Sequence, residues 1–201
     1  MGKFAATKIM SQLVFATHNV NKTKEVNALL WPQYQVLNLI DIGCLTDIEE
    51  TGASFAENAT LKSSYVTEHF KLDCFADDSG LEVEALNNEP GIFSARYSGS
   101  RGDVVNLNYL LRKMHGITDR KARFKTVISL MKNGKNYLFE GVINGELRTE
   151  PIGEMGFGYD PIFQPDGYAE TFAQMPMEKK NEISHRAIAM RKLIDFLKAR
   201  D

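Results

Sequence analysis

The sequence is poor in cysteine, and its two cysteines form no motif. Cys44 and Cys74 lie far apart, without the CxxC spacing of a zinc site or the density of a disulfide framework. Long hydrophobic runs are also missing: no segment approaches the roughly 20 apolar residues that cross a membrane. Residues 1–11 carry two lysines but lack the apolar core of a signal peptide. We therefore expect a cytoplasmic protein with no membrane partner.

A dominant charge is absent as well. The chain has 24 lysines and arginines against 26 aspartates and glutamates, and its net charge of −2 argues against broad electrostatic binding to nucleic acid. An anionic ligand would need a local basic site instead. With 201 residues, of which 43% are hydrophobic and 25% charged, the chain can bury the core of one soluble domain.

What the sequence does contain is an alternation of short apolar runs with helical spacings. The runs predict strands at residues 12–17, 36–39, 74–77, 81–86, 122–131 and 137–143. Apolar residues at helical spacing predict helices at residues 22–30, 54–70, 103–114 and 184–200. An Asn-Gly pair predicts a hairpin between the last two strands, and glycines and prolines predict a long loop region at residues 145–167. This order predicts an α/β protein with a mixed sheet.

Two pairs of acidic residues are candidate metal ligands. Asp77 and Asp78 end a predicted strand, a place where carboxylates commonly hold a hard divalent cation, before a Ser-Gly pair breaks the pattern. The same residues are also ordinary turn chemistry. Glu49 and Glu50 could supply a second carboxylate, or they could belong to a solvated loop. Because neighbours on a strand face opposite sides, Asp77 and Asp78 should not share one site equally.

A candidate phosphate site lies where the first predicted strand meets the first predicted helix. Free N–H groups and the positive dipole end at a helix N-terminus suit phosphate. Thr17 and Asn19 can add hydrogen bonds there, and Lys22 can add a charge. The segment lacks the GxxxxGKS/T pattern of a Walker A loop. The alternative is that Thr17 and Asn19 only cap the helix.

A third segment could hold a nucleobase. Gly156 and Gly158 let the backbone approach a ligand closely. Phe157 and Tyr159 offer flat faces on which a base can stack, and Asp160 can accept hydrogen bonds from ring N–H groups. The alternative is an aromatic plug in a β-turn.

The start of the last predicted helix carries charges of the wrong sign. Ser184 is the expected N-cap, so His185 and Arg186 fall in the first turn, where cations oppose the helix dipole. Lys179 and Lys180 lie just upstream. This local conflict indicates a site for an anion or an electron-rich carbonyl. The alternative is a solvated His-Arg pair that costs up to about 1 kcal/mol.

Six segments, taken together and in order, match a known family. They are residues 16–22 (ATHNVNK), 49–52 (EETG), 76–81 (ADDSGL), 90–99 (PGIFSARYSG), 156–161 (GFGYDP) and 183–186 (ISHR). The chain resembles the noncanonical purine nucleoside triphosphate pyrophosphatases, the inosine/xanthosine triphosphate pyrophosphatase family, over residues 13–197. Each segment alone is weak, but the ordered set is highly specific.

The resemblance implies a fold, a reaction and an assembly. The fold would be α/β, with a mixed, elongated central β-sheet flanked by helices in two lobes and the active site in the cleft between them. The reaction would be Mg²⁺-dependent hydrolysis of dITP, ITP or XTP to the monophosphate and pyrophosphate, which keeps these nucleotides out of DNA and RNA. A homodimer is expected. Residues 1–11 precede the usual family start and would be a terminal extension of a single domain at residues 12–201.

The resemblance also implies residue roles. Asp78 would be the catalytic residue, and Glu49 and Asp78 would bind magnesium. The substrate-binding residues would be Thr17, His18, Asn19, Val20, Asn21, Lys22, Ser79, Phe157, Gly158, Tyr159, Asp160, Lys180, His185 and Arg186. His18 departs from the glycine often found at its position. Whether Asp78 takes the proton of the attacking water or only positions that water is left open.

Base selection has a physical rationale. Hypoxanthine and xanthine carry a 6-oxo acceptor where adenine has an amino donor, so a donor from Arg186 or from a backbone N–H near Phe157 would favour them. Guanine shares the 6-oxo group, so its exclusion must arise at the 2-position. Two competing hypotheses are a pyrophosphatase for pyrimidine or modified nucleotides and a non-catalytic nucleotide-binding or nucleic-acid-binding module.

Overall fold

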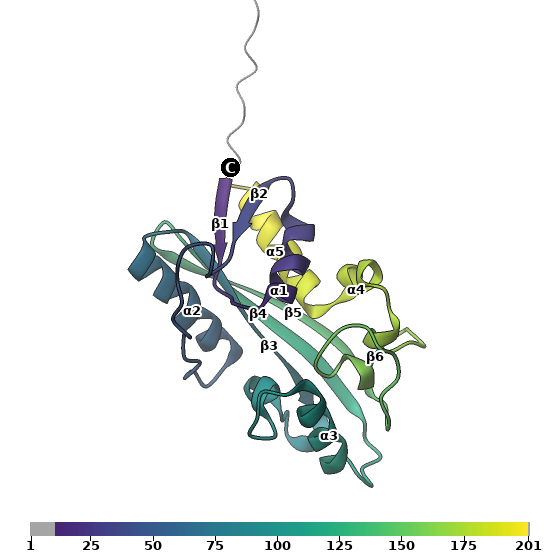
Figure 1. Cartoon of the computed structure of the whole chain (residues 1–201). Helices are drawn as coiled ribbons and strands as arrows, with labels where there is room; N and C mark the ends of the chain where they lie inside the picture. Colours follow the sequence, from purple (N-terminus) through teal and green to yellow (C-terminus); the bar gives the residue numbers. More distant parts are fainter. Residues whose placement is uncertain (1–10, 201) are drawn as a thin grey trace, which may run out of the picture.

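A six-stranded mixed sheet forms the centre of the protein, in the order β2-β1-β3-β4-β5-β6 (Figure 1). The computed structural model describes residues 11–200, with the side chains of Ser11, Asn21 and Glu25 left out. The strands are β1 Ser11–Phe15, β2 Tyr34–Leu37, β3 Cys74–Val83, β4 Lys121–Lys132, β5 Lys135–Leu147 and β6 Phe163–Pro165. β1 runs parallel to β2 and β3, and the remaining neighbours are antiparallel. The predicted α/β class with a mixed sheet is therefore confirmed.

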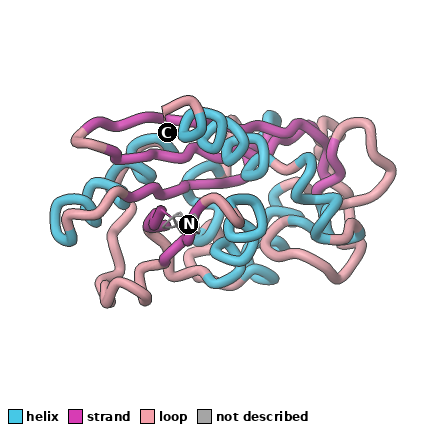
Figure 2. The backbone as a smooth tube through the Cα atoms, turned by 90° about the horizontal axis from the view of Figure 1, so that it is seen from above, coloured by secondary structure: helices cyan, strands magenta, loops and turns pink. Residues whose placement is uncertain are grey.

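Helices flank both faces of this sheet (Figure 2). The α-helices are α1 Val20–Leu30, α2 Phe55–Phe70, α3 Asp103–Lys113, α4 Met177–Ile183 and α5 His185–Lys198. Four short 3₁₀ turns lie between these elements in the described chain: η1 Glu84–Leu86, η2 Gly91–Arg96, η3 Asp160–Ile162 and η4 Phe172–Gln174. None of the helices among residues 11–200 combines the length and apolarity needed to cross a bilayer.

Local sequence signals set the helix ends. α1 stops before Trp31-Pro32, as the restriction on residues before proline predicts. Ser54 caps α2 by accepting the N–H of Glu57, and the Glu57 carboxylate accepts the N–H of Ala53 in return. Ser184 caps α5 by accepting the N–H of Ala187 at 3.2 Å. These caps place the first residues of α2 and α5 where the sequence predicted them.

The core is divided between the two halves of the sheet. Around β1 and β2, α1 and α5 cover one face through Val26, Leu30 and Leu193, while α2 covers the other through Val66. In the other half, α3 and the turns η3 and η4 pack on the far ends of β3 and β4. Only the long strands β3, β4 and β5 run through both halves (Figure 1).

The expectation that a strand ends at the acidic pair is wrong. β3 continues through Asp77, Asp78 and Ser79 to Val83, because each of these residues pairs with β4 in an antiparallel ladder. Gly80 does not turn the chain. It leaves room for η2, since a Cβ at this position would lie 2.3 Å from the carbonyl oxygen of Gly91. The acidic pair therefore sits inside a rigid strand.

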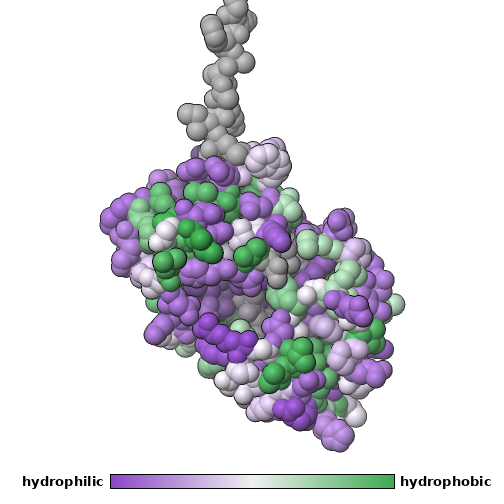
Figure 3. Space-filling view, in the orientation of Figure 1, coloured by the Kyte–Doolittle hydropathy of each residue, from purple (hydrophilic) through white to green (hydrophobic). Residues whose placement is uncertain are grey.

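The opposite edge of β3 is where the sheet splits. β1 pairs with β3 only at Cys74 and Phe75, and the next partner on that edge is a bridge from Glu82 to Pro90. Between these points, within the described residues, no strand pairs with this edge of β3. A recess crosses the middle of the face shown in Figure 3, between the two halves. The split leaves Asp77, Asp78 and Ser79 at an open sheet edge.

Other predicted boundaries changed in the loop-rich region. The expected loop at residues 145–167 contains the end of β5, the turn η3 and the strand β6, because Gly145 and Leu147 pair with β6. α4 and η2 were not predicted, since neither has a clear apolar stripe. The Asn133-Gly134 hairpin is confirmed, with φ of 52° and 72°.

One glycine controls how closely α5 approaches the sheet. A Cβ at Gly141 on β5 would lie 2.1 Å from the carbonyl oxygen of His185 and 2.6 Å from the amide nitrogen of Ala189. We predict that Gly141→Ala lowers the free energy of unfolding by about 1–3 kcal/mol, because the first turn of α5 must move away. Urea denaturation measures this change. Gly102→Ala, whose Cβ would meet Val105 at an ordinary 3.4 Å, should cost less than about 1 kcal/mol; equal costs would contradict the account.

Candidate active site

A buried carboxylate, Asp77, joins three elements at the split of the sheet. Its Oδ1 accepts a hydrogen bond from Nζ of Lys22 on α1 at 2.9 Å. Its Oδ2 accepts from Nε of Arg186 on α5 at 3.2 Å and from Oγ of Ser79 at 3.0 Å. Asp77 and Arg186 are only 2% and 4% exposed, so this ion pair is almost fully removed from water.

The electrostatics make Asp77 a permanent anion. Burial alone would raise the pKa of this carboxyl, but Lys22 and Arg186 outweigh burial and hold the pKa well below its usual range. Both carboxylate oxygens already accept hydrogen bonds. Asp77 is therefore suited to hold basic side chains in place and unsuited to exchange protons.

Asp78, on the opposite side of β3, has a different environment. Its Oδ2 accepts from Nδ2 of Asn58 on α2 at 2.9 Å, and its Oδ1 accepts from the backbone N–H of Ser79 at 2.9 Å. Burial raises the pKa of the Asp78 carboxyl; Lys62 opposes the rise and Glu50 adds to it. Asp78 forms no ion pair among residues 11–200, and with its raised pKa it is the member of the acidic pair that can accept a proton.

Lys62 links residues 44–52, which we call the acidic loop, to this centre, and sequence reasoning missed it. Its Nζ donates to Oε1 of Glu50 at 2.5 Å and to the carbonyl oxygen of Asp77 at 2.7 Å. Asn58 and Lys62 are four residues apart on α2 and both contact β3. The sequence did contain a signal for these residues. Asn58 and Lys62 are polar, lie one turn apart, and share the helix face that carries the buried apolar residues.

The acidic loop approaches the site through Glu50. Glu50 pairs with Lys62 and lies 3.5 Å from Nη1 of Arg96, while the predicted magnesium ligand Glu49 is exposed. The basic neighbours outweigh burial and lower the pKa of Glu50. Among residues 11–200 no three histidines, cysteines or carboxylates gather closely enough to hold a metal. A metal here would have to take most of its oxygen ligands from substrate and water, as Mg²⁺ does at nucleotide sites.

The predicted phosphate loop is ordered by its own hydrogen bonds. The side chain of Asn19 caps α1 by accepting the N–H of Lys22 at 3.2 Å, and Oγ1 of Thr17 accepts the N–H of Asn19 at 3.0 Å. His18 lies 3.0 Å through Nε2 from the carbonyl oxygen of Cys44, which ties this loop to the acidic loop. Val20 is exposed. The side chain of Asn21 lies outside the described residues.

The wrong-signed charges at the start of α5 are neutralised within the protein. Arg186 pairs with Asp77, so no bound anion is needed to explain it. Burial, with Arg186 and Lys180 adding, lowers the pKa of His185 well below 6.5, so this imidazole is neutral. His185 stacks on Phe124 with ring centroids 4.8 Å apart. Its buried Nδ1 has no hydrogen-bond partner among the described residues, a vacancy that a polar ligand atom could fill.

A second polar pair lies under the aromatic segment. Nζ of buried Lys180 donates to Oδ2 of Asp160 at 2.8 Å and lies 4.7 Å from the ring centre of Phe157. Oδ2 of Asp160 also accepts the N–H of Phe157, and the N–H of Gly158 donates to Asp103. The backbone donors expected near Phe157 are therefore already used.

The aromatic segment, residues 156–160, has one buried ring, that of Tyr159, and one partly exposed ring, that of Phe157. Tyr159 is buried, and its hydroxyl donates to the carbonyl oxygen of Ser94 at 2.9 Å, as the plug interpretation expects. Phe157 is only partly buried and lines a cavity of about 280 Å³ with Lys24 of α1 and Lys180 of α4. Arg186 lies 6.0 Å from the Phe157 ring and also holds Asp77, so it joins the aromatic end to the acidic end.

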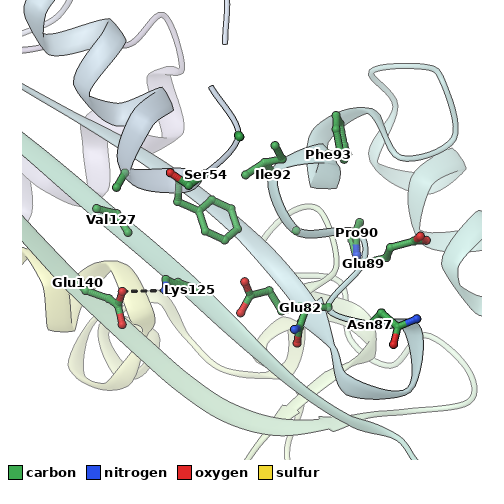
Figure 4. A pocket seen from close by; sticks show the side chains of 15 residues that line it. Ser54, Glu82, Asn87, Glu89, Pro90, Ile92, Phe93, Lys125, Val127 and Glu140 are labelled. Atoms are coloured by element: carbon green, nitrogen blue, oxygen red, sulfur yellow. Dashed lines mark ion pairs between the residues drawn. The ribbon is translucent and has the colours of Figure 1, made fainter. Parts of the chain in front are cut away.

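Another cavity, of about 430 Å³, lies between the start of α2 and residues 87–93 (Figure 4). Its three carboxylates all have partners: Glu140 pairs with Lys125, Glu82 with Arg123, and Glu89 with Lys113. None of the predicted site residues lines it. Its charges are satisfied within the protein.

The structure thus gathers six of the sixteen predicted site residues into two groups, which Arg186 joins. One group contains Lys22, Asp77, Asp78 and Ser79, joined by Asn58, Lys62 and Glu50. The other contains Phe157, Asp160 and Lys180. Val20 and Glu49 are exposed and belong to neither group.

Comparisons with known proteins show which family the chain resembles. A family model described as the Ham1 family matches residues 13–196. A protein of Flavobacterium psychrophilum named dITP/XTP pyrophosphatase is 53% identical over 188 residues, covering 93% of this chain and 99% of the relative. A Porphyromonas gingivalis protein of the same name is 45% identical, covering 94% and 98%.

Solved structures give the same result. The Staphylococcus aureus Ham1 protein superposes with a TM-score of 0.88 at 41% identity, covering 95% of this chain and all of the other. A nucleoside-triphosphatase / dITP/XTP pyrophosphatase of Mycobacterium abscessus gives a TM-score of 0.76 at 37% identity, covering 91% and 98%.

Asp77 should be central to stability. We predict that Asp77→Asn lowers the free energy of unfolding at pH 7 by about 3–5 kcal/mol, because two basic side chains lose their buried counter-charge. The folded pKa of Asp77 lies below the unfolded value of about 3.9, so its contribution to stability is complete well above that value, begins to fade as pH falls below it, and is lost only as pH falls through the folded pKa. Urea denaturation at pH 7 and at pH 3.5 should show the gap between wild type and variant narrowing at the lower pH. An equal gap at both values would contradict this role.

Proposed function

The chain belongs to the Ham1 family, and from this we propose that it hydrolyses dITP, ITP and XTP to the monophosphate and pyrophosphate. Relatives with 53% and 45% identity over nearly the whole chain are named dITP/XTP pyrophosphatase. The observation that carries the proposal is the pairing, across one split in the sheet, of an acidic and basic cluster with an aromatic cluster. Arg186 contacts both clusters. A nucleotide presents the same two ends, an anionic phosphate chain and a flat base.

The acidic end suits the phosphates and a divalent cation. Asp78, with Glu49 or Glu50 from the acidic loop, would hold Mg²⁺ together with phosphate oxygens. Magnesium supplies neutralisation of phosphate charge and a more acidic bound water. Lys22 and Lys62 lie beside this position and can neutralise the phosphate chain further.

The reaction needs one proton acceptor. Water attacks the α-phosphorus, the bond from that phosphorus to the bridging oxygen breaks, and pyrophosphate leaves with the electron pair. Two roles are open to Asp78: as a free carboxylate, whose pKa burial raises, it accepts the proton of the water, and as a ligand of Mg²⁺ it positions that water; Asp77 is locked as an anion and serves neither role. Asp77 keeps Lys22 and Arg186 in position during the step.

The aromatic end suits a 6-oxopurine. The backbone N–H groups of Phe157 and Gly158 are occupied, which leaves the neutral His185 as the better source of a donor. A neutral imidazole carries one N–H, and a 6-oxo group accepts it where the amino group of adenine cannot. This moves part of the base selection from Arg186 to His185.

Removal of these nucleotides before a polymerase uses them is the cellular role we propose. A cytoplasmic homodimer without nucleic-acid or membrane partners, and a single domain at residues 12–201, remain predictions from the sequence. The predicted extension, residues 1–11, falls almost wholly outside the described residues.

The substrate claim is tested by supplying dITP, XTP, dATP, dGTP and dUTP with Mg²⁺ and following pyrophosphate. We predict release from dITP and XTP at least about 100-fold faster, in kcat/KM, than from dATP, because a mismatched polar group in a buried site discriminates at that scale. Preference for dUTP would favour the pyrimidine alternative. Binding without release would favour the non-catalytic module.

The role of Asp78 is tested by Asp78→Asn, which removes the proton acceptor but keeps the shape. We predict that kcat/KM for dITP falls by at least about 100-fold. Glu82→Gln is the matched control, because Glu82 lies on the same face of β3 but pairs with Arg123 outside the cluster. Circular dichroism checks that both variants are folded. Activity of Asp78→Asn within tenfold of wild type would remove Asp78 from the mechanism.

A further inference from the structure

Three methionines line the cavity of about 280 Å³ beside Phe157. Met155 lies in the loop before η3, Met175 follows η4, and Met177 begins α4. Met175 is buried at 1% exposure, whereas Met155 and Met177 are 45% and 54% exposed. Two large apolar side chains thus stand open at the mouth of a cavity that also reaches Lys24 in the other half of the protein.

The backbones that carry these side chains are held firmly. The N–H of Met155 donates to the carbonyl oxygen of Ala173 at 2.9 Å. Met177 lies in the first turn of α4, whose N–H of Lys180 donates to the carbonyl oxygen of Pro176. With the backbone held in this way, the thioether side chains, which have three rotatable bonds each, can still change their conformation.

A cavity lined by methionines suits flat aromatic rings that carry different substituents. Thioether sulfur contacts aromatic rings favourably, often at the ring edge, and the side chain re-packs around different shapes. Hypoxanthine and xanthine differ at the 2-position, so a rigid wall there would fit one and exclude the other. A wall of two exposed methionines can close on both.

We propose that Met155 and Met177 are base-affinity residues that close over the purine, and that their oxidation weakens this contact. The inference rests on the proposed function, because it takes the cavity beside Phe157 as the base subsite. A peroxide transfers one oxygen atom to the thioether sulfur, which loses two electrons; the O–O bond breaks and the second oxygen leaves as water or an alcohol. The resulting sulfoxide is polar and disrupts an apolar contact.

The first test measures equilibrium binding of IMP and XMP, without metal, by dialysis. Met155→Ala and Met177→Ala should each weaken binding of both nucleotides by roughly two- to tenfold, the range of a thioether–aromatic contact. Leu138→Ala is the matched control, because Leu138 is equally exposed, at 52%, but lies on β5 outside the cavity. Its IMP affinity should match wild type. Unchanged affinity in both methionine variants, or no IMP binding by wild type, overturns the inference.

The second test treats the protein with hydrogen peroxide and repeats the dialysis, with sulfoxides located by mass spectrometry. Treated wild-type protein should lose IMP affinity. Met131→Leu should lose it too and serves as a control, because Met131 lies on β4 outside the cavity. A double variant with Met155→Leu and Met177→Leu should have the same IMP affinity before and after treatment. Wild-type affinity that survives oxidation of both residues contradicts the proposal. These binding measurements do not depend on hydrolysis, so the two claims can fail separately. IMP binding without dITP hydrolysis would refute only the proposed function. Hydrolysis of dITP by wild type, with unchanged IMP affinity in the methionine variants, would refute only this inference.

Discussion

The buried ion pair between Asp77 and its two basic partners is the interaction on which the site depends. It joins β3 to α1 through Lys22 and to α5 through Arg186. Removing three charges from water is costly unless each has a close partner, and here the carboxylate uses both oxygens and also accepts Ser79. The charged carboxylate fixes Arg186 at the start of α5, beside the neutral His185.

The same strand holds a second carboxylate in a different state because successive residues face opposite sides. Asp78 faces α2, where Asn58 donates a hydrogen bond to it. Burial raises the pKa of Asp78 even though Lys62 lies nearby and opposes the rise. The open edge of β3 presents both residues to the split between the two halves of the sheet. One side of the strand fixes geometry, and the other side is free for chemistry.

The sequence predicted the α/β class with a mixed sheet from the order of its elements, and local signals predicted the start of α2, the helix cap at Ser184 and the hairpin at Asn133. Sequence reasoning misplaced the end of β3, since Asp-Asp-Ser-Gly is turn chemistry until an antiparallel neighbour pairs with it. It also assigned Arg186 to a site for an anionic ligand. The actual partner of Arg186, Asp77, lies 109 positions away in the chain, and local sequence patterns cannot identify such a partner. Lys62 was also missed, although its place one turn from Asn58 on the buried face of α2 was a local signal. The roles of the candidate residues remain predictions that need functional tests.

The central claim is that two adjacent aspartates on one strand have opposite acid–base characters. Carbon-13 NMR titration of the two side-chain carboxyls in metal-free protein measures this directly. The account predicts that Asp77 stays ionised to the lowest pH at which the protein remains folded, while Asp78 takes up its proton above the ordinary aspartate value of about 3.9. Two carboxyls that titrate together, or Asp77 protonating first, would contradict it.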